Sequence, residues 1–143
     1  MTGEAPLSDR LETPQMLAPA GLMTPRAHYS HGVATEEWVF VAGETATGPD
    51  GQLVGVDDIT AQTTQTIANI ATVLAEVGLG LGDVVSTTVY LPSFDHYRAF
   101  DAAYAAAFGE HRPARATLGC TLVHPALLVE IQAVAVRPRP SVP

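Results

Sequence analysis

The chain has 143 residues, enough for one domain with a substantial hydrophobic core. Its formal net charge is −8 and its few basic residues form no run, so nucleic acid is excluded as an expected partner. All seven basic residues are arginine, and the absence of lysine excludes a lysine Schiff base and the P-loop lysine of nucleotide hydrolases.

The N-terminal region is expected to be a flexible extension over residues 1–25. It contains four prolines and several acidic residues, and it lacks the basic and then apolar pattern of a signal peptide. No apolar run approaches the roughly 20 residues of a membrane-spanning helix, so no membrane partner is expected. Residues 26–137 are expected to form a single domain, followed by a flexible, proline-rich tail over 138–143.

The first half of the domain predicts a strand followed by a helix. A β-rich run over 38–43 indicates the strand, with a possible shorter strand over 32–35, and residues 46–55 carry the turn signals of a loop. Asp57 or Asp58 can then cap a helix that ends at Gly78. Apolar and threonine side chains at helical spacing mark its buried stripe: Ile59, Thr63, Ile67, Ile70, Leu74 and Val77.

The second half predicts a strand over 83–91, a helix capped by Ser93, and two more strands over 117–123 and 127–136. The large apolar residues of this helix are Tyr97, Phe100, Tyr104 and Phe108. Two helices covering one face of a mixed sheet make an α+β fold. The strands are apolar on both sides, so we expect a symmetric oligomer to cover the other face of the sheet.

Two charged residues in apolar surroundings are the main candidates for a functional site. Arg115 follows Pro113 at the start of an apolar strand, and its planar fork of donors matches a carboxylate, although it can equally pair with a surface acid. Glu130 is expected in the middle of the last strand, where it is either a structural partner of Arg115 or of a backbone amide, or a functional acid. Apolar surroundings raise a carboxyl pKa, which suits proton transfer near neutral pH.

The histidines and the single cysteine suggest no further chemistry. His28 and His31 have a spacing that can serve a metal, but no third ligand accompanies them and no metal site is expected. His96, His111 and His124 are expected to be solvated. Cys120 is predicted to be a buried, inert thiol within a strand, and a lone cysteine fits a reducing cytoplasm.

Four motifs in order resemble the RidA (YjgF) family of reactive-intermediate deaminases between about His28 and Arg137. They are the sequences Tyr29-Ser30-His31-Gly32-Val33, Val39-Phe40-Val41-Ala42-Gly43-Glu44, Pro113-Ala114-Arg115, and the apolar run that holds Glu130. The resemblance implies a chorismate-mutase-like fold, with three copies packing their sheets around a central barrel and with sites in the clefts between subunits. It also implies a cytoplasmic, cofactor-independent hydrolase similar to 2-iminobutanoate/2-iminopropanoate deaminases.

The resemblance also implies roles for individual residues. Arg115 would bind the substrate carboxylate with help from the Gly43 amide, and Glu130 would hold the hydrolytic water. The Arg115 charge would limit how far the pKa of Glu130 rises. Tyr29 would form a pocket wall and His31 would lie at the pocket mouth. The expected substrate is a small enamine or imine that carries a carboxylate.

Several positions depart from the family pattern. Ala42 stands where serine is common, Glu44 where glutamine is frequent, Asp101 where asparagine is common and Thr117 where many members carry cysteine. His28 and Ala27 also replace the usual proline and glycine before Tyr29. Two alternatives therefore stay open. One is an enzyme dedicated to a single catabolic or biosynthetic intermediate, by hydrolysis, tautomerisation or rearrangement. The other is a non-catalytic trimer that binds a small carboxylate or a protein partner.

Overall fold

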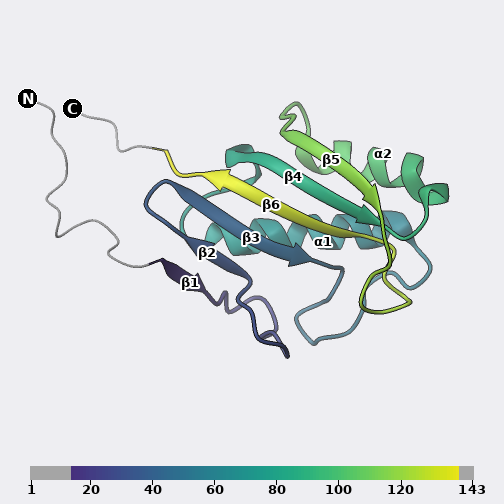
Figure 1. Cartoon of the computed structure of the whole chain (residues 1–143), viewed down its shortest axis with the longest axis horizontal. Coiled ribbons are helices and arrows are strands. Elements are labelled where there is room, and N and C mark those ends of the chain that lie inside the picture. The colour runs from purple at the N-terminus through teal and green to yellow at the C-terminus, as the bar shows by residue number, and fades with distance from the viewer. Residues whose placement is uncertain (1–13, 139–143) are drawn as a thin grey trace, which may run out of the picture.

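The computed structural model of the protein describes residues 14–138, which form one six-stranded mixed sheet and two α-helices (Figure 1). The strands lie side by side in the order β1-β2-β3-β6-β4-β5. In chain order the elements are β1 (Gln15–Leu17), β2 (Gly32–Ala34), β3 (Trp38–Glu44), α1 (Ile59–Ala75), β4 (Val84–Leu91), α2 (Tyr97–Phe108), β5 (Ala114–Gly119) and β6 (Glu130–Val136). Short 3₁₀ turns, η2 (Leu81–Asp83) and η3 (Phe94–His96), precede β4 and α2.

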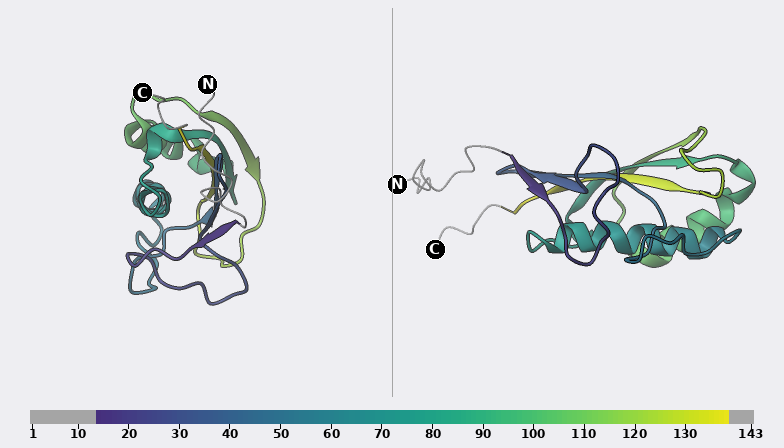
Figure 2. Two further views of the ribbon diagram at one scale, coloured as in Figure 1. Left: turned by 90° about the vertical axis from the view of Figure 1, so that its left-hand side faces the viewer. Right: turned by 90° about the horizontal axis from the view of Figure 1, so that it is seen from below.

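Both helices lie on the same face of the sheet, which confirms the predicted α+β arrangement (Figure 2). α1 begins where the side chain of Asp58 accepts a hydrogen bond from the backbone N–H of Ala61 at 3.0 Å. The helix ends at Ala75, and Gly78 then adopts the positive φ of 74° expected from its sequence position. The predicted stripe of α1 is buried against the sheet, apart from the partly buried Val77.

The centre of the sheet is antiparallel, with β6 between β3 and β4, whereas β5 runs parallel to β4 at the edge. α2 provides the crossover that a parallel neighbour requires. The core lies between the sheet and the helices, and it includes Val39, Val41, Val89, Ile131 and Phe100. Among residues 14–138, no helix is both long and apolar enough to cross a membrane.

The face of the sheet opposite the helices carries exposed apolar side chains. Strand register aligns Met16, Val33, Phe40 and Val134 across four neighbouring strands on this face. The exposed fraction is 48% for Phe40 and 45% for Leu118. This agrees with the expectation that the strands are apolar on both sides, and an uncovered apolar face of this kind is a candidate for subunit contact.

Part of the predicted N-terminal extension is an ordered strand. Residues 1–13 lie outside the described residues, but β1 pairs with β2 and the side chain of Leu17 is buried in the core. The ordered domain therefore starts before the predicted boundary at residue 26. A three-residue strand among prolines has no periodicity, and it is held by tertiary pairing that a local pattern does not reveal. Of the predicted tail, residues 139–143 lie outside the described range.

The last two strands differ from the prediction: β5 is shifted toward the N-terminus and β6 is shorter. β5 begins at Ala114 rather than at residue 117 and ends at Gly119, because its partner β4 ends at Leu91, directly opposite Gly119. Cys120 therefore lies beyond the strand and is exposed in the chain, not buried as predicted. β6 begins at Glu130, so this carboxylate is the first residue of the strand and not a central one.

Candidate functional site

The C-terminal end of β3 carries a bulge that directs neighbouring residues to different environments. The register between β3 and β6 shifts between Val41 and Glu44. As a result Gly43 is exposed, whereas Glu44 next to it is buried, with an exposed fraction of 5%. Bulges often re-aim side chains in this way next to functional sites.

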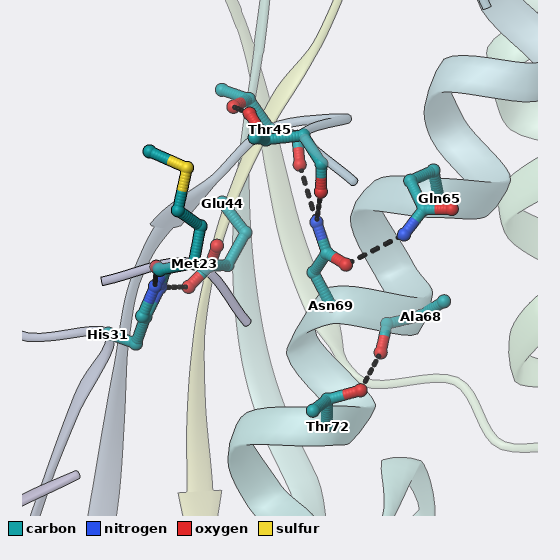
Figure 3. Close-up of polar contacts among 9 residues, drawn as sticks. Met23, His31, Glu44, Thr45, Gln65, Ala68, Asn69 and Thr72 are labelled. Atoms are coloured by element: carbon teal, nitrogen blue, oxygen red, sulfur yellow. Dashed lines mark hydrogen bonds and ion pairs between the residues drawn. The ribbon is translucent and has the colours of Figure 1, made fainter. Parts of the chain in front are cut away.

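The buried carboxylate of Glu44 is paired with His31 (Figure 3). Nδ1 of His31 lies 2.7 Å from Oε1 of Glu44, and Nε2 lies 2.7 Å from the backbone carbonyl oxygen of Met23. Burial lowers the pKa of His31, but the Met23 carbonyl and Glu44 outweigh it, and the net shift is upward. Burial raises the pKa of Glu44. His31 was predicted at the pocket mouth, and here it also ties the segment around Met23 to β3.

A cavity of about 240 Å³ opens beside this pair. Its wall includes Met23, Tyr29, His31, Gly43 and Glu44, so predicted residues from two motifs meet here. The ring of Tyr29 lies edge-on to His31, with 6.4 Å between the ring centroids. Burial, and then the charges of Glu44 and Glu130, raises the pKa of Tyr29. Ala42, the other predicted residue of β3, contributes its backbone N–H, which donates to the carbonyl of His31 at 2.8 Å.

The far side of this cavity is formed by α1 through Asn69. The amide nitrogen of Asn69 donates to the carbonyls of Thr45 and Thr47 at 2.9 and 2.8 Å, and its oxygen accepts from Gln65 at 2.8 Å (Figure 3). These bonds fasten the loop after β3 to the helix. Sequence reasoning did not single out Asn69, although it lies three residues after Thr66 and four before Val73, on the buried side of α1, and a buried amide needs hydrogen-bond partners.

The Glu130 side chain lies directly against Gly43. A Cβ atom added to Gly43 would lie 2.8 Å from Oε2 of Glu130, closer than real contacts of a Cβ allow. The missing side chain of Gly43 therefore makes room for the carboxylate, in addition to the predicted approach of a ligand. Burial raises the pKa of Glu130, and within the described chain the Arg115 charge makes no contribution to this shift. Within one chain, Arg115 therefore does not limit the rise in the pKa of Glu130 as was expected.

Arg115 lies in a cage built by α2. Its guanidinium carbon is 4.8 Å from the ring centroid of Tyr104, 5.3 Å from that of Phe100 and 5.9 Å from that of Tyr97. Nη1 donates to Oδ1 of Asp101 at 2.9 Å and Nη2 donates to the hydroxyl of Tyr97 at 3.0 Å. The predicted residues Arg115 and Asp101 are therefore brought together. Thr117, two residues further along β5, shares the same face of the strand.

A second cavity of about 390 Å³ lies beside this cage. Arg115, Asp101, Tyr104, His111 and Arg112 line it. His111 is partly buried and not solvated as expected, since Nε2 of its ring lies 2.7 Å from the carbonyl oxygen of Val84.

The register of the sheet places Arg115 and Glu130 on opposite faces. Arg115 stands opposite Thr87, whose hydroxyl lies 2.7 Å from that of Tyr104 on the helix-covered side. Glu130 stands opposite Tyr90, and it alternates with the buried Ile131, which faces the helices. The direct Arg115–Glu130 pairing considered from the sequence is therefore excluded within one chain.

Comparison with known proteins identifies the family of the chain. The family model described as Endoribonuclease L-PSP matches residues 20–137. The chain belongs to the RidA (YjgF) family. A RutC family protein of Pyrococcus abyssi is 33% identical over 111 residues, which cover 78% of this chain and 87% of that protein.

Solved RidA structures agree with the fold. The crystal structure of the Escherichia coli YjgF gene product has a TM-score of 0.80 at 27% identity, covering 87% of this chain and 99% of that one. A Rid family protein from Yersinia pestis has a TM-score of 0.82 at 26% identity, covering 87% of this chain and all of that one. The family recognised from the motifs is therefore confirmed.

In this RidA chain the predicted site residues lie in two separate groups. Tyr29, His31, Ala42, Gly43 and Glu130 gather around the end of β3, and Arg115, Asp101 and Thr117 gather between β5 and α2. The aromatic residues that hold Arg115 were recognised in the sequence only as the apolar side of a helix. Such a pattern of large apolar residues does not distinguish core packing from a cation cage.

Proposed function

We propose that the protein hydrolyses reactive enamine and imine carboxylates to 2-oxo acids and ammonia in the cytoplasm, as a symmetric trimer with sites between subunits. The observation that carries the proposal is the separation of two functional groups by the sheet. Arg115 has the donor fork that binds a carboxylate, and Glu130 has a raised pKa beside the exposed Gly43. A site that uses both groups takes them from two copies.

The surface of the chain supports such an assembly. The face of the sheet that carries Glu130 also exposes Phe40 and Leu118, and burial of this apolar area would stabilise a contact between copies. β5, which carries Arg115, is an edge strand with one side unpaired within the described chain. In a cyclic arrangement the edge of one copy meets the open face of the next, which brings Arg115 of one subunit toward Glu130 of its neighbour.

The proposed mechanism uses these groups in sequence. Arg115, helped by the exposed Gly43 amide, holds the substrate carboxylate once the enamine has tautomerised to an imine and the imine nitrogen has been protonated to the iminium. Water held by Glu130 attacks the iminium carbon, and Glu130 accepts a proton from this water and returns it to the nitrogen. The C–N bond then breaks as the hydroxyl oxygen forms the carbonyl, and the hydroxyl proton passes to the departing ammonia, so that an iminium carboxylate and water give a 2-oxo acid and ammonium. Positioning supplies much of the acceleration, because the substrate is already reactive.

The first experiment is ammonia release from 2-aminoacrylate and its longer homologue, generated in situ by a dehydratase. We expect acceleration by the wild type and its loss in Arg115→Ala. Glu130→Gln keeps the shape of the side chain and should reduce the rate by about 10²-fold or more. A folded wild-type trimer that gives no acceleration would reject the general deaminase and favour a dedicated intermediate, as the departures at Ala42, Glu44, Asp101 and Thr117 allow.

The subunit-interface arrangement has its own test. Arg115→Ala and Glu130→Gln subunits, each inactive alone, are unfolded together and reassembled in equal amounts. If each site combines Arg115 of one copy with Glu130 of the next, about one quarter of the sites contain both native residues and activity returns in that proportion. If both residues serve within one chain, the mixture stays as inactive as either parent.

A further inference from the structure

Asp101 occupies one side of the carboxylate-binding arginine. The distance from Nη1 of Arg115 to Oδ1 of Asp101 is 2.9 Å, and the Tyr97 hydroxyl accepts from Nη2. Within residues 14–138 these are the two hydrogen-bond acceptors of the guanidinium, so its remaining N–H groups are available to a ligand. The three rings of the cage hold the arginine in place, and its side chain is only 19% exposed.

The carboxylate of Asp101 is much more open to solvent than the arginine it binds. Its side chain is 50% exposed, and it lines the cavity of about 390 Å³ together with Arg115. A molecule in this cavity therefore meets the positive groups of Arg115 and Arg112 and, beside Arg115, the negative group of Asp101. A ligand that carries only a carboxylate gains from Arg115 but is repelled by Asp101. A ligand with a cationic nitrogen next to its carboxylate gains from both.

We infer that Asp101 sets the charge preference of the Arg115 site, which favours zwitterions with a cationic nitrogen beside the carboxylate over plain monoanions. Iminium carboxylates and amino acids have this arrangement, with the two charges on adjacent carbons. The inference relies on the proposed function only in placing a ligand carboxylate at Arg115. It adds that the substrate is held in its iminium form and the 2-oxo product is not.

The preference has a direct consequence for turnover. Hydrolysis converts the iminium carboxylate and water into a 2-oxo acid and ammonium, so the organic product loses the cationic nitrogen. Asp101 then repels the remaining monoanion, and product release becomes easier. A neutral amide at this position would remove the repulsion and retain the product.

The test measures binding and not catalysis, with alanine and pyruvate as probes that share a carbon skeleton. Calorimetric titrations of each probe are compared for the wild type, Asp101→Asn and Asp95→Asn. Asp101→Asn is nearly isosteric and can still accept from Arg115. Asp95→Asn is the matched control, because Asp95 is exposed on the turn before α2 and its substitution changes the net charge equally. Melting curves confirm that each variant is folded.

We expect the wild type to bind alanine more tightly than pyruvate and Asp101→Asn to shift the ratio of the two Kd values by about tenfold toward pyruvate, equivalent to about 1.4 kcal/mol. Asp95→Asn should leave the ratio unchanged. An unchanged ratio in Asp101→Asn, equal weakening of both probes, or absence of saturable binding of both probes to the wild type would overturn the inference. Ammonia release is not part of this test, so loss of the charge preference in an active deaminase rejects this inference alone.

Discussion

Both ring nitrogens of His31 face oxygen atoms, because Nδ1 lies 2.7 Å from the Glu44 carboxylate and Nε2 lies 2.7 Å from the Met23 carbonyl. A carbonyl oxygen only accepts, so Nε2 must carry a hydrogen. The short contact to Glu44 then contains a second proton, which resides on either the imidazole or the carboxyl group. The pair therefore holds one titratable proton between two nearly buried side chains.

This shared proton makes stability depend on pH. The pKa of His31 is raised in the folded protein, since the Met23 carbonyl and Glu44 outweigh the opposing effect of burial, and burial also raises the pKa of Glu44. The folded state thus keeps a proton that the unfolded chain releases above about pH 6.5. We expect the pair to make its full contribution to the free energy of unfolding below that pH. This contribution should fall as the pH rises through the folded pKa.

Urea denaturation at a series of pH values measures this effect. The control is His31→Gln/Glu44→Gln, in which two amides keep a hydrogen bond but have no proton to release. The difference in stability between wild type and control should decrease from about pH 6.5 to pH 8.5. Parallel curves for the two proteins would show that the pair does not hold the proton.

The pair also predicts strong coupling between single substitutions. His31→Leu leaves the buried Glu44 carboxylate and the Met23 carbonyl without their partner, and we expect a loss of about 3 kcal/mol. Adding Glu44→Leu removes the unpaired charge and should recover much of the loss. A double-mutant cycle by chemical denaturation measures the coupling, and additive effects of the two substitutions would contradict it.

The sequence motifs were sufficient to identify the family. Periodicity and helix caps depend on a few neighbouring residues, so they were sufficient to predict the layers and most strand positions. They were not sufficient for the geometry of the site. The opposite placement of Arg115 and Glu130 depends on the β4–β5 and β4–β6 registers, which join segments far apart in the chain. The His31–Glu44 pair depends on the bulge in β3, which inverts the expected alternation after Val41.

The contact between Gly43 and Glu130 predicts that the addition of a single methyl group at Gly43 reduces activity strongly. In Gly43→Ala the new Cβ would lie 2.8 Å from Oε2 of Glu130 and would force the carboxylate to move. If Glu130 holds the hydrolytic water, we expect ammonia release to fall by about tenfold to a hundredfold with little change in stability. Gly82→Ala is the matched control, because its added Cβ meets no atom within 4 Å. Equal activity of both variants would show that the position of Glu130 does not matter for turnover.

Gln62 explains why β6 begins at Glu130 and not earlier, and it gives the last prediction. Its side chain is completely buried, with Nε2 donating to the carbonyls of Gly55 and Ala126 and Oε1 accepting from the N–H of Leu128. The backbone before Glu130 is thus bonded to α1 and not to a neighbouring strand. Gln62→Leu keeps the size of the side chain but leaves these three backbone groups unpaired, so we expect a loss of about 2–4 kcal/mol.

Amide hydrogen exchange at Leu128 reports this contact directly, since its N–H loses its acceptor in Gln62→Leu and should exchange faster. Gln65→Leu on the same helix is the control, because among residues 14–138 the side chain of Gln65 bonds to Asn69 alone, and the loss of this bond should cost about 1 kcal/mol without affecting Leu128. Unchanged protection of Leu128 in Gln62→Leu would mean that other contacts hold the segment before Glu130. Faster exchange together with slower ammonia release would link this buried amide to the placement of the proposed catalytic carboxylate.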